Sequence, residues 1–288
     1  MNRARLYGLG IETEFFLPDW FVLDTSSRGP DVIVRIGSPQ GKPAADSSQF
    51  GAERSVLVFP GWLDADVLDG REIVVHPGPE CDEKMLALLV AGPALAVALR
   101  QRGSLVLHGS AVRASEGCIA ILGPSGSGKS TAAARLVESG LQLVADDVVA
   151  ITPSMNGQRV QPAYPLVKLW PEAARLIGRD PTELPVVEAG DRGLKRGLRV
   201  SDFATDPAPL SKVVVIRPDQ VDFASIRGPE AVKAISDNLY VPPYRVEEGQ
   251  WKGDFSSIAA LVSEVEVFQV EREALSGPAV QGLLERGD

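Results

Sequence analysis

The segment with the clearest chemistry is 123–130, which reads Gly-Pro-Ser-Gly-Ser-Gly-Lys-Ser. It satisfies the phosphate-loop pattern of a glycine, four residues, Gly-Lys, and then Ser or Thr. Its glycines allow successive backbone N–H groups to turn toward one anion, and the helix expected after the loop adds its positive end. Lys129 can reach β- and γ-phosphate oxygens, and the Ser130 hydroxyl can bind Mg²⁺. The segment therefore predicts a site for ATP or GTP with Mg²⁺.

The residues expected to contact the nucleotide are those of the loop and the first turn of the helix. They are Gly123, Ser125, Gly126, Ser127, Gly128, Lys129, Ser130 and Thr131.

Two adjacent carboxylates, Asp146 and Asp147, follow the apolar run 141–145. One short helix and one turn separate this run from the loop, so we expect the pair at the end of the next strand, where α/β sheets place ligand chemistry. Neighbouring residues on a strand point to opposite faces, so both can face the nucleotide only if the strand ends before them. We interpret one carboxylate as a Mg²⁺ partner and the other as the base for an acceptor hydroxyl.

A third group of charged residues lies in segment 191–199, which places four cations among glycines. Within it, Lys195 and Arg196 are candidates to clamp a phosphate or an acidic peptide. A solvated loop explains the same pattern equally well.

The elements around the loop follow from local patterns. A strand is expected at 118–122, directly before the loop, and an alanine-rich helix at 130–139 ends at Gly140. The turn-like segment 114–117 joins the strand to an earlier one at 105–108, which predicts a hairpin. Further elements of this part are strands at 148–151 and 213–216 and a short helix at 171–177 that begins with a proline.

Residues 1–100 predict a smaller β-rich unit that ends in a helix. The expected strands are 31–37, 55–60 and 71–76, and the helical pattern 82–99 is broken at Gly92-Pro93. This unit contains no phosphate loop and no nucleophile cluster, so we interpret it as a scaffold or acceptor-recognition domain. Residues 101–288 would then form the α/β domain.

Composition excludes some classes of function. The 288 residues carry 29 Lys and Arg against 38 Asp and Glu, a net charge of −9, which argues against a nucleic-acid partner. No apolar run approaches the roughly 18 residues of a membrane span. The N-terminus lacks the apolar core of a secretory signal, and Cys81 and Cys118 form no metal-ligand spacing, so we expect a cytoplasmic protein.

The order of these motifs resembles a known family. Leu-His-Gly-Ser-Ala-Val at 107–112, a hairpin, the loop, a helix and Ala-Asp-Asp at 145–147 resemble the catalytic domain of HPr kinase/phosphorylase. That family shares its phosphate-loop architecture with phosphoenolpyruvate carboxykinase. The resemblance is close over 105–151 and weaker toward the C-terminus. The chain is also similar to shorter HPr-kinase-like proteins, some of which phosphorylate a serine of a ribosomally made precursor peptide, as in lasso-peptide pathways.

The resemblance implies an α/β fold with a phosphate-loop kinase domain of HPr kinase/carboxykinase type and a smaller β-rich N-terminal domain. It implies ATP-dependent transfer to a serine hydroxyl of a peptide or protein acceptor, and it is compatible with a homo-oligomer. Carried over to this sequence, it makes Asp146 the base at the acceptor serine and Asp147, with Ser130, the metal partner. Lys129 would hold the phosphates, and His108 would lie near the transferred phosphate.

The sequence departs from the family at three places, one of which is a shorter N-terminal unit. Thr131 stands where the bifunctional enzymes usually have a glutamate, and segment 187–193 keeps only a remnant of their glycine-rich signature. These departures argue against a phosphorylase half-reaction and against HPr itself as the acceptor.

Two other functions remain open. One is a small-molecule hydroxyl kinase resembling the shikimate kinase group, in which an acid follows the loop at a similar distance. Those chains begin at the loop strand, whereas here a hairpin with His108 precedes the loop. The other is a regulator that binds a nucleotide without transferring phosphate.

Overall fold

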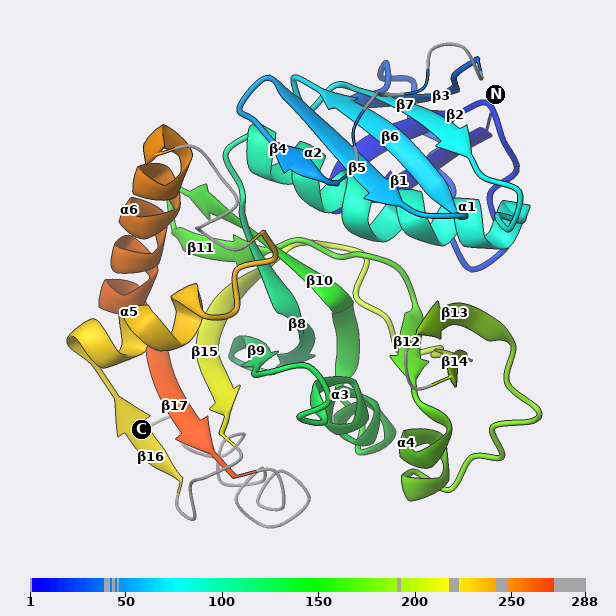
Figure 1. Cartoon of the computed structure of the whole chain (residues 1–288). Coiled ribbons are helices and arrows are strands. Elements are labelled where there is room, and N and C mark those ends of the chain that lie inside the picture. Colours follow the sequence, from blue (N-terminus) through cyan, green and yellow to red (C-terminus); the bar gives the residue numbers. More distant parts are fainter. Residues whose placement is uncertain are drawn as a thin grey trace.

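The computed structural model describes residues 2–38, 42, 45, 47–190, 193–217, 223–241 and 248–271. Over these residues the chain is a mixed α/β protein with three β-sheets (Figure 1). Among them, no helix is long and apolar enough to span a membrane.

The N-terminal part forms a seven-stranded sheet in the order β1-β2-β3-β7-β6-β5-β4. Its strands are β1 (Asn2–Leu6), β2 (Leu9–Thr13), β3 (Val32–Ile36), β4 (Gln49–Phe50), β5 (Arg54–Phe59), β6 (Leu63–Leu68) and β7 (Glu72–Pro77). The three strands predicted from β-branched runs are confirmed as β3, β5 and β7. The turn between β6 and β7 contains Asp69 and Gly70, whose φ angles of 50° and 60° are those that Asp-Gly turn chemistry favours.

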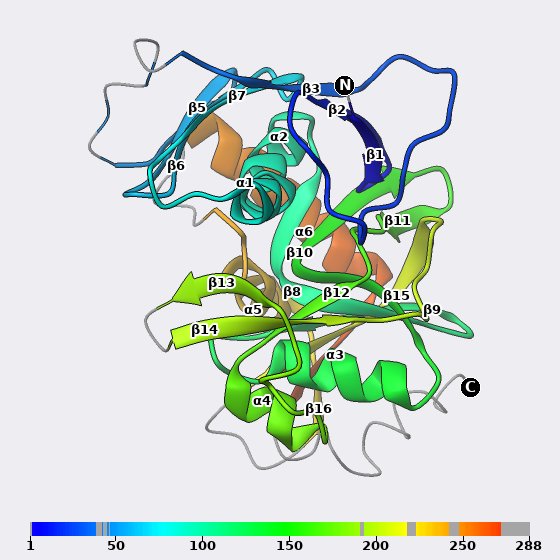
Figure 2. The same cartoon turned by 90° about the vertical axis from the view of Figure 1, so that its right-hand side faces the viewer.

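The predicted broken helix is confirmed as three consecutive segments: α1 (Glu83–Leu89), the π-helical turn η2 (Val90–Ala94) and α2 (Leu95–Gln101). Pro93 lies inside η2, where its missing N–H interrupts the regular hydrogen bonding. The helix lies between the N-terminal sheet and a second sheet (Figure 2), and residues 94–99 are all buried. Contact with both sheets explains why this segment is apolar all round.

The second, central sheet also has seven strands, in the order β11-β10-β8-β9-β15-β17-β16. They are β8 (Leu105–Ala114), β9 (Gly117–Leu122), β10 (Gln142–Ser154), β11 (Gly157–Val160), β15 (Ala208–Ile216), β16 (Ala224–Ile226) and β17 (Glu266–Val270). The predicted hairpin is confirmed, because Ala114 pairs with Gly117 across antiparallel β8 and β9. Strand β15 runs parallel to β9 and to β17.

A third sheet of three strands has the order β12-β14-β13, with β12 (Leu166–Leu169), β13 (Val186–Gly190) and β14 (Gly193–Arg199). The described part of the cationic segment is therefore a strand, not a loop. The remaining helices of the described residues are α3 (Lys129–Glu138), α4 (Pro171–Leu176), α5 (Gly228–Ser236) and α6 (Glu248–Glu264). Helices α3 and α4 confirm the alanine-rich helix and the proline-initiated helix that the sequence predicts.

The central sheet separates two apolar clusters because its strands alternate their side chains between two faces. In β9, Ala120 and Leu122 belong to the cluster that includes α2, α5, α6 and the N-terminal sheet. Ile119 and Ile121 belong to the cluster that includes α3. One continuous core thus contains residues from both large sheets, and a domain boundary at residue 100 stays a prediction.

Candidate active site

The phosphate-loop segment has the predicted strand–loop–helix structure: β9 ends at Leu122 and α3 begins at Lys129. Gly123, Gly126 and Gly128 have φ angles of 146°, 79° and 100°, which L-residues rarely adopt. A Cβ at Gly123 would lie 2.9 Å from the carbonyl oxygen of Ile216. The curl of this loop therefore depends on glycine at these positions.

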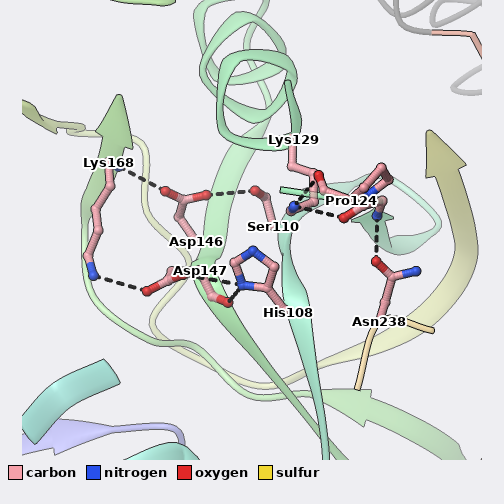
Figure 3. Close-up of polar contacts among 9 residues, drawn as sticks. His108, Ser110, Pro124, Lys129, Asp146, Asp147, Lys168 and Asn238 are labelled. Carbon is pink, nitrogen blue, oxygen red and sulfur yellow. Dashed lines mark hydrogen bonds and ion pairs between the residues drawn. The ribbon is translucent and has the colours of Figure 1, made fainter. Parts of the chain in front are cut away.

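The side chain of Lys129 folds back onto the backbone of the loop. Its Nζ donates hydrogen bonds to the carbonyl oxygens of Gly123, at 2.8 Å, and Pro124, at 3.1 Å (Figure 3). Burial lowers the pKa of Lys129, while the charges of Asp146 and Asp147 act to raise it. The lysine side chain is thus held close to the loop backbone and to the acidic pair.

The position of the acidic pair differs from the expectation in one respect. The prediction that the strand ends before Asp146 and Asp147 is wrong, because β10 continues through both residues to Ser154. Asp147 instead has a left-handed φ of 75°, and the pairing of β10 with β8 shifts register between Leu143 and Ala145. These irregularities change the strict alternation of the strand, and both carboxylates line the same cavity.

Asp146 is almost completely buried, with 2% of its surface exposed. Its carboxylate accepts hydrogen bonds from Ser110 Oγ at 2.6 Å and from the backbone N–H of Lys168 at 2.8 Å. Burial raises the pKa of Asp146, and the hydrogen bonds from Ser110, Lys168 and Ser130 only partly offset that rise. Asp146 is therefore fixed next to the first turn of the phosphate-loop helix.

Asp147 faces a different set of groups. Its Oδ2 lies 3.0 Å from Lys168 Nζ, and its Oδ1 lies 3.3 Å from His108 Nδ1. Burial raises the pKa of Asp147, but Lys168, His108 and Lys195 outweigh it and hold the pKa well below its ordinary value. The carboxylate is thus ionised at neutral pH.

Sequence reasoning missed Lys168 as a site residue. Its side chain is 6% exposed and lies on β12, which comes next to β10 only in the tertiary structure. The signal in the sequence was a lysine inside the apolar run 166–169, because a buried cation needs a charged partner. Ser110 and Asn238 were missed as well, and Asn238 Oδ1 accepts a hydrogen bond of 2.8 Å from the N–H of Gly123.

A cavity of about 420 Å³ brings most of the predicted residues together. Its lining includes His108, Ser125, Gly126, Gly128, Lys129, Ser130, Thr131, Asp146, Asp147 and Lys195. Gly123 and Ser127 belong to the loop but do not line the cavity. Arg196 is not brought to the site either, since its guanidinium donates to the carbonyl oxygen of Leu184 at 3.2 Å. Lys195, in contrast, lies 5.3 Å above the ring of Trp170, which also lines the cavity.

A second cavity of about 500 Å³ shares four lining residues with the first: His108, Asp147, Lys168 and Lys195. Most of its remaining walls are apolar and come from the N-terminal sheet and from α1. Asp147 therefore faces both cavities, whereas Asp146 lines only the first.

The oxygen donors of the site suit Mg²⁺. Within the described part of the chain, no three His, Cys, Asp or Glu side chains cluster in a way that could hold a metal by themselves. Mg²⁺ at phosphate sites is usually held by one or two carboxylates together with substrate phosphates and water, and Ser130 and Asp146 offer such a set. Of the expected glycine-rich remnant at 187–193, Asp191 and Arg192 lie outside the described residues.

No family model matches the chain, and no curated protein matches it. Among solved structures, the chain is similar to the HPr(Ser) kinase/phosphatase from Coxiella burnetii, with 13% sequence identity and a TM-score of 0.35. The match covers 63% of this chain and 93% of that chain. A likeness at this level leaves the function to be inferred from the residues of the site.

Proposed function

We propose that this chain is an ATP-dependent kinase that transfers the γ-phosphoryl group to a serine hydroxyl of a peptide or protein acceptor. The observation that carries the proposal is the meeting of Lys129 and Ser130 with Asp146 and Asp147 in one cavity. The resemblance of the sequence extends the proposal to a ribosomally made precursor peptide, of the lasso-peptide type, as the acceptor.

The loop would hold the phosphates mainly through its backbone. Gly123, Gly126 and Gly128 have positive φ angles, a backbone conformation found in loops that bind an anion through N–H groups, and the N-terminus of α3 would add its partial positive charge. Lys129 would exchange its contacts with the carbonyl oxygens of Gly123 and Pro124 for β- and γ-phosphate oxygens. Its positive charge stabilises the negative charge of the transition state.

Ser130 and Asp146 would form the metal side of the site. The Ser130 hydroxyl interacts with the Asp146 carboxyl, so both oxygens lie at the start of the phosphate-loop helix. Bound there, Mg²⁺ would neutralise part of the negative charge of the phosphates. Ser110 and the backbone N–H of Lys168 keep the carboxylate in place.

Asp147 would act on the acceptor hydroxyl, which reverses the division of roles expected from the sequence. It lines both cavities, so a hydroxyl placed between them can reach it. Lys168 and His108 hold it in position, and its low pKa keeps it ionised. A low pKa is compatible with this role because phosphoryl transfer depends mainly on positioning and charge stabilisation.

The test is transfer of label from γ-labelled ATP to serine-containing peptides in the presence of Mg²⁺. Lys129→Ala should abolish transfer, because it removes a charge that contributes several kcal/mol, on the order of 10²-fold or more in rate, to the transition state. Undiminished transfer by this variant would exclude the proposed site. A nucleotide-binding regulator would bind ATP and transfer nothing.

The two aspartates can be separated in the same assay. Asp147→Asn should keep ATP affinity and lower turnover by about 10²-fold or more, whereas Asp146→Asn should raise the Mg²⁺ concentration needed for half-maximal rate. Asp66→Asn is the matched control, because Asp66 is a buried carboxylate of β6 that is paired with Arg54 and lines neither cavity. If Asp146→Asn loses turnover but needs the same Mg²⁺ concentration as the wild type, Asp146 and not Asp147 is the base.

A further inference from the structure

The second cavity has an apolar body and one charged end. Its body is lined by aromatic and aliphatic side chains from the N-terminal sheet, from α1 and from the segment after α5, among them Phe59, Trp62, Met85, Leu89 and Tyr240. Among the described residues that line it, the acidic and basic ones are the four that it shares with the first cavity. The charged end therefore coincides with the place where phosphate would be transferred.

We propose that this cavity is the acceptor pocket, and that it selects a serine whose neighbouring residue has a bulky apolar side chain. The inference rests on the proposed kinase function and names the class of substrate for that site. A hydroxyl that receives the γ-phosphoryl group must lie between the phosphate loop and the base. Asp147 lies at that junction, because it lines both cavities.

The lining argues for an apolar neighbour and against a polar one. Burial of an apolar side chain is favourable in proportion to the area removed from water. A sugar, a polyol or a charged side chain would lose its hydrogen bonds to water, and the described residues that line the body of the pocket include no charged partner to replace them. The volume of about 500 Å³ lies in the range of ligand pockets and can accept an aromatic side chain together with the serine.

This arrangement assigns a role in acceptor recognition to residues 1–100. Phe59 and Trp62 come from the strand β5 and the turn that follows it, and Met85 and Leu89 come from α1. The phosphate loop and the acidic pair come from the central sheet. Most of the apolar wall of the acceptor pocket and the phosphate chemistry thus come from different parts of the chain, which meet at Asp147.

The experiment uses the full chain with ATP and Mg²⁺ and short synthetic peptides that contain one serine. The residues flanking the serine are Phe, Leu, Gly or Asp, and both kcat/KM for transfer and peptide affinity by fluorescence polarisation are measured. We expect Phe and Leu to raise kcat/KM by about 10- to 100-fold over Gly and Asp, the usual range for an apolar pocket. The small apolar alcohol 4-phenylbutan-1-ol serves as a further acceptor. If phosphate is transferred to it as efficiently as to the best peptide, the proposal that the acceptor is a peptide is wrong.

Two variants of the pocket and one control test its location. Leu89→Gln and Met85→Trp, which place a polar group in the pocket or fill it, should reduce the preference for Phe and Leu to less than about 3-fold while ATP affinity stays unchanged. Leu9→Gln is the control, because Leu9 is also a partly buried leucine packed against the same core but lines neither cavity. A preference that survives both pocket variants would overturn the assignment of the pocket.

The failures of the two proposals are distinguishable. Transfer to all peptides without an apolar preference would overturn the acceptor pocket and keep the kinase. Selective binding of the Phe and Leu peptides with no transfer to any acceptor would overturn the kinase and keep the specificity of the pocket.

Discussion

Lys168 forms a buried ion pair with Asp147, and Lys168→Met removes the positive charge of this pair. The substitution keeps the apolar stem of the side chain and the backbone N–H that donates a hydrogen bond to Asp146. The two side chains are 6% and 18% exposed, and the atoms Lys168 Nζ and Asp147 Oδ2 are 3.0 Å apart. Breaking a buried pair by removing one partner typically costs about 3–5 kcal/mol. Because Asp147 keeps His108 and some contact with water, we expect the free energy of unfolding to fall by about 2–3 kcal/mol.

The effect should depend on pH with a definite sign. Among the charges, Lys168 lowers the pKa of Asp147 most, so the variant's carboxyl pKa moves back toward its ordinary value. A carboxyl whose pKa is lowered by folding stabilises the protein above its unfolded pKa of about 3.9, and this stabilisation is lost as the pH falls through the folded pKa. The difference between wild type and Lys168→Met should therefore be complete at neutral pH and shrink below about pH 4.

The assay is urea unfolding of Lys168→Met, Asp147→Asn and the double variant, followed by circular dichroism. We expect a coupling energy of about 2 kcal/mol between the two sites. Lys212→Met is the matched control, because Lys212 is a buried lysine of β15 whose Nζ lies 4.0 Å from the half-exposed carboxylate of Glu116, outside both cavities. A coupling energy below about 0.5 kcal/mol, or an equal loss of stability in Lys212→Met, would refute the reasoning.

Three further changes have defined outcomes. Gly128→Ala should weaken ATP binding in calorimetric titration, because alanine at a φ of 100° is strained by about 1–2 kcal/mol. Gly140→Ala is the control: Gly140 has a φ of 104° but lies outside the site, so this variant should lose stability and keep its ATP affinity. Asn238→Ala leaves the buried N–H of Gly123 without its acceptor and should cost about 1–3 kcal/mol of stability, measured by thermal unfolding; an unchanged melting temperature would contradict this. Burial raises the pKa of the Cys118 thiol to about 12, so in a Cys81→Ser variant at pH 8 Ellman's reagent should modify Cys118 only after unfolding, and rapid reaction of this variant in its native state would disprove the burial of Cys118.

The elements predicted correctly are those whose cause is local. The phosphate loop, the hairpin before it and the interrupted helix each depend on glycine, proline or turn residues within a few positions of one another. The strand β6, in contrast, was missed because it contains Asp64 and Asp66, a residue type that is depleted in strands. Asp66 is accommodated by a 2.6 Å ion pair with Arg54 on the neighbouring strand β5, and such a partner cannot be identified from the run of residues alone.

By itself, the sequence predicted the conformation of the glycine-rich loop and determined that an acidic pair follows it, because loop conformation and chain order are local properties. Only the tertiary structure decided how the pair is used. The left-handed backbone of Asp147 lets two consecutive residues of one strand face one cavity, and β12 brings Lys168 to it from a distant part of the chain. The position of the N-terminal sheet then adds the apolar cavity. These relations depend on sheet order and register, which arise from contacts between distant segments and leave no continuous pattern in the sequence.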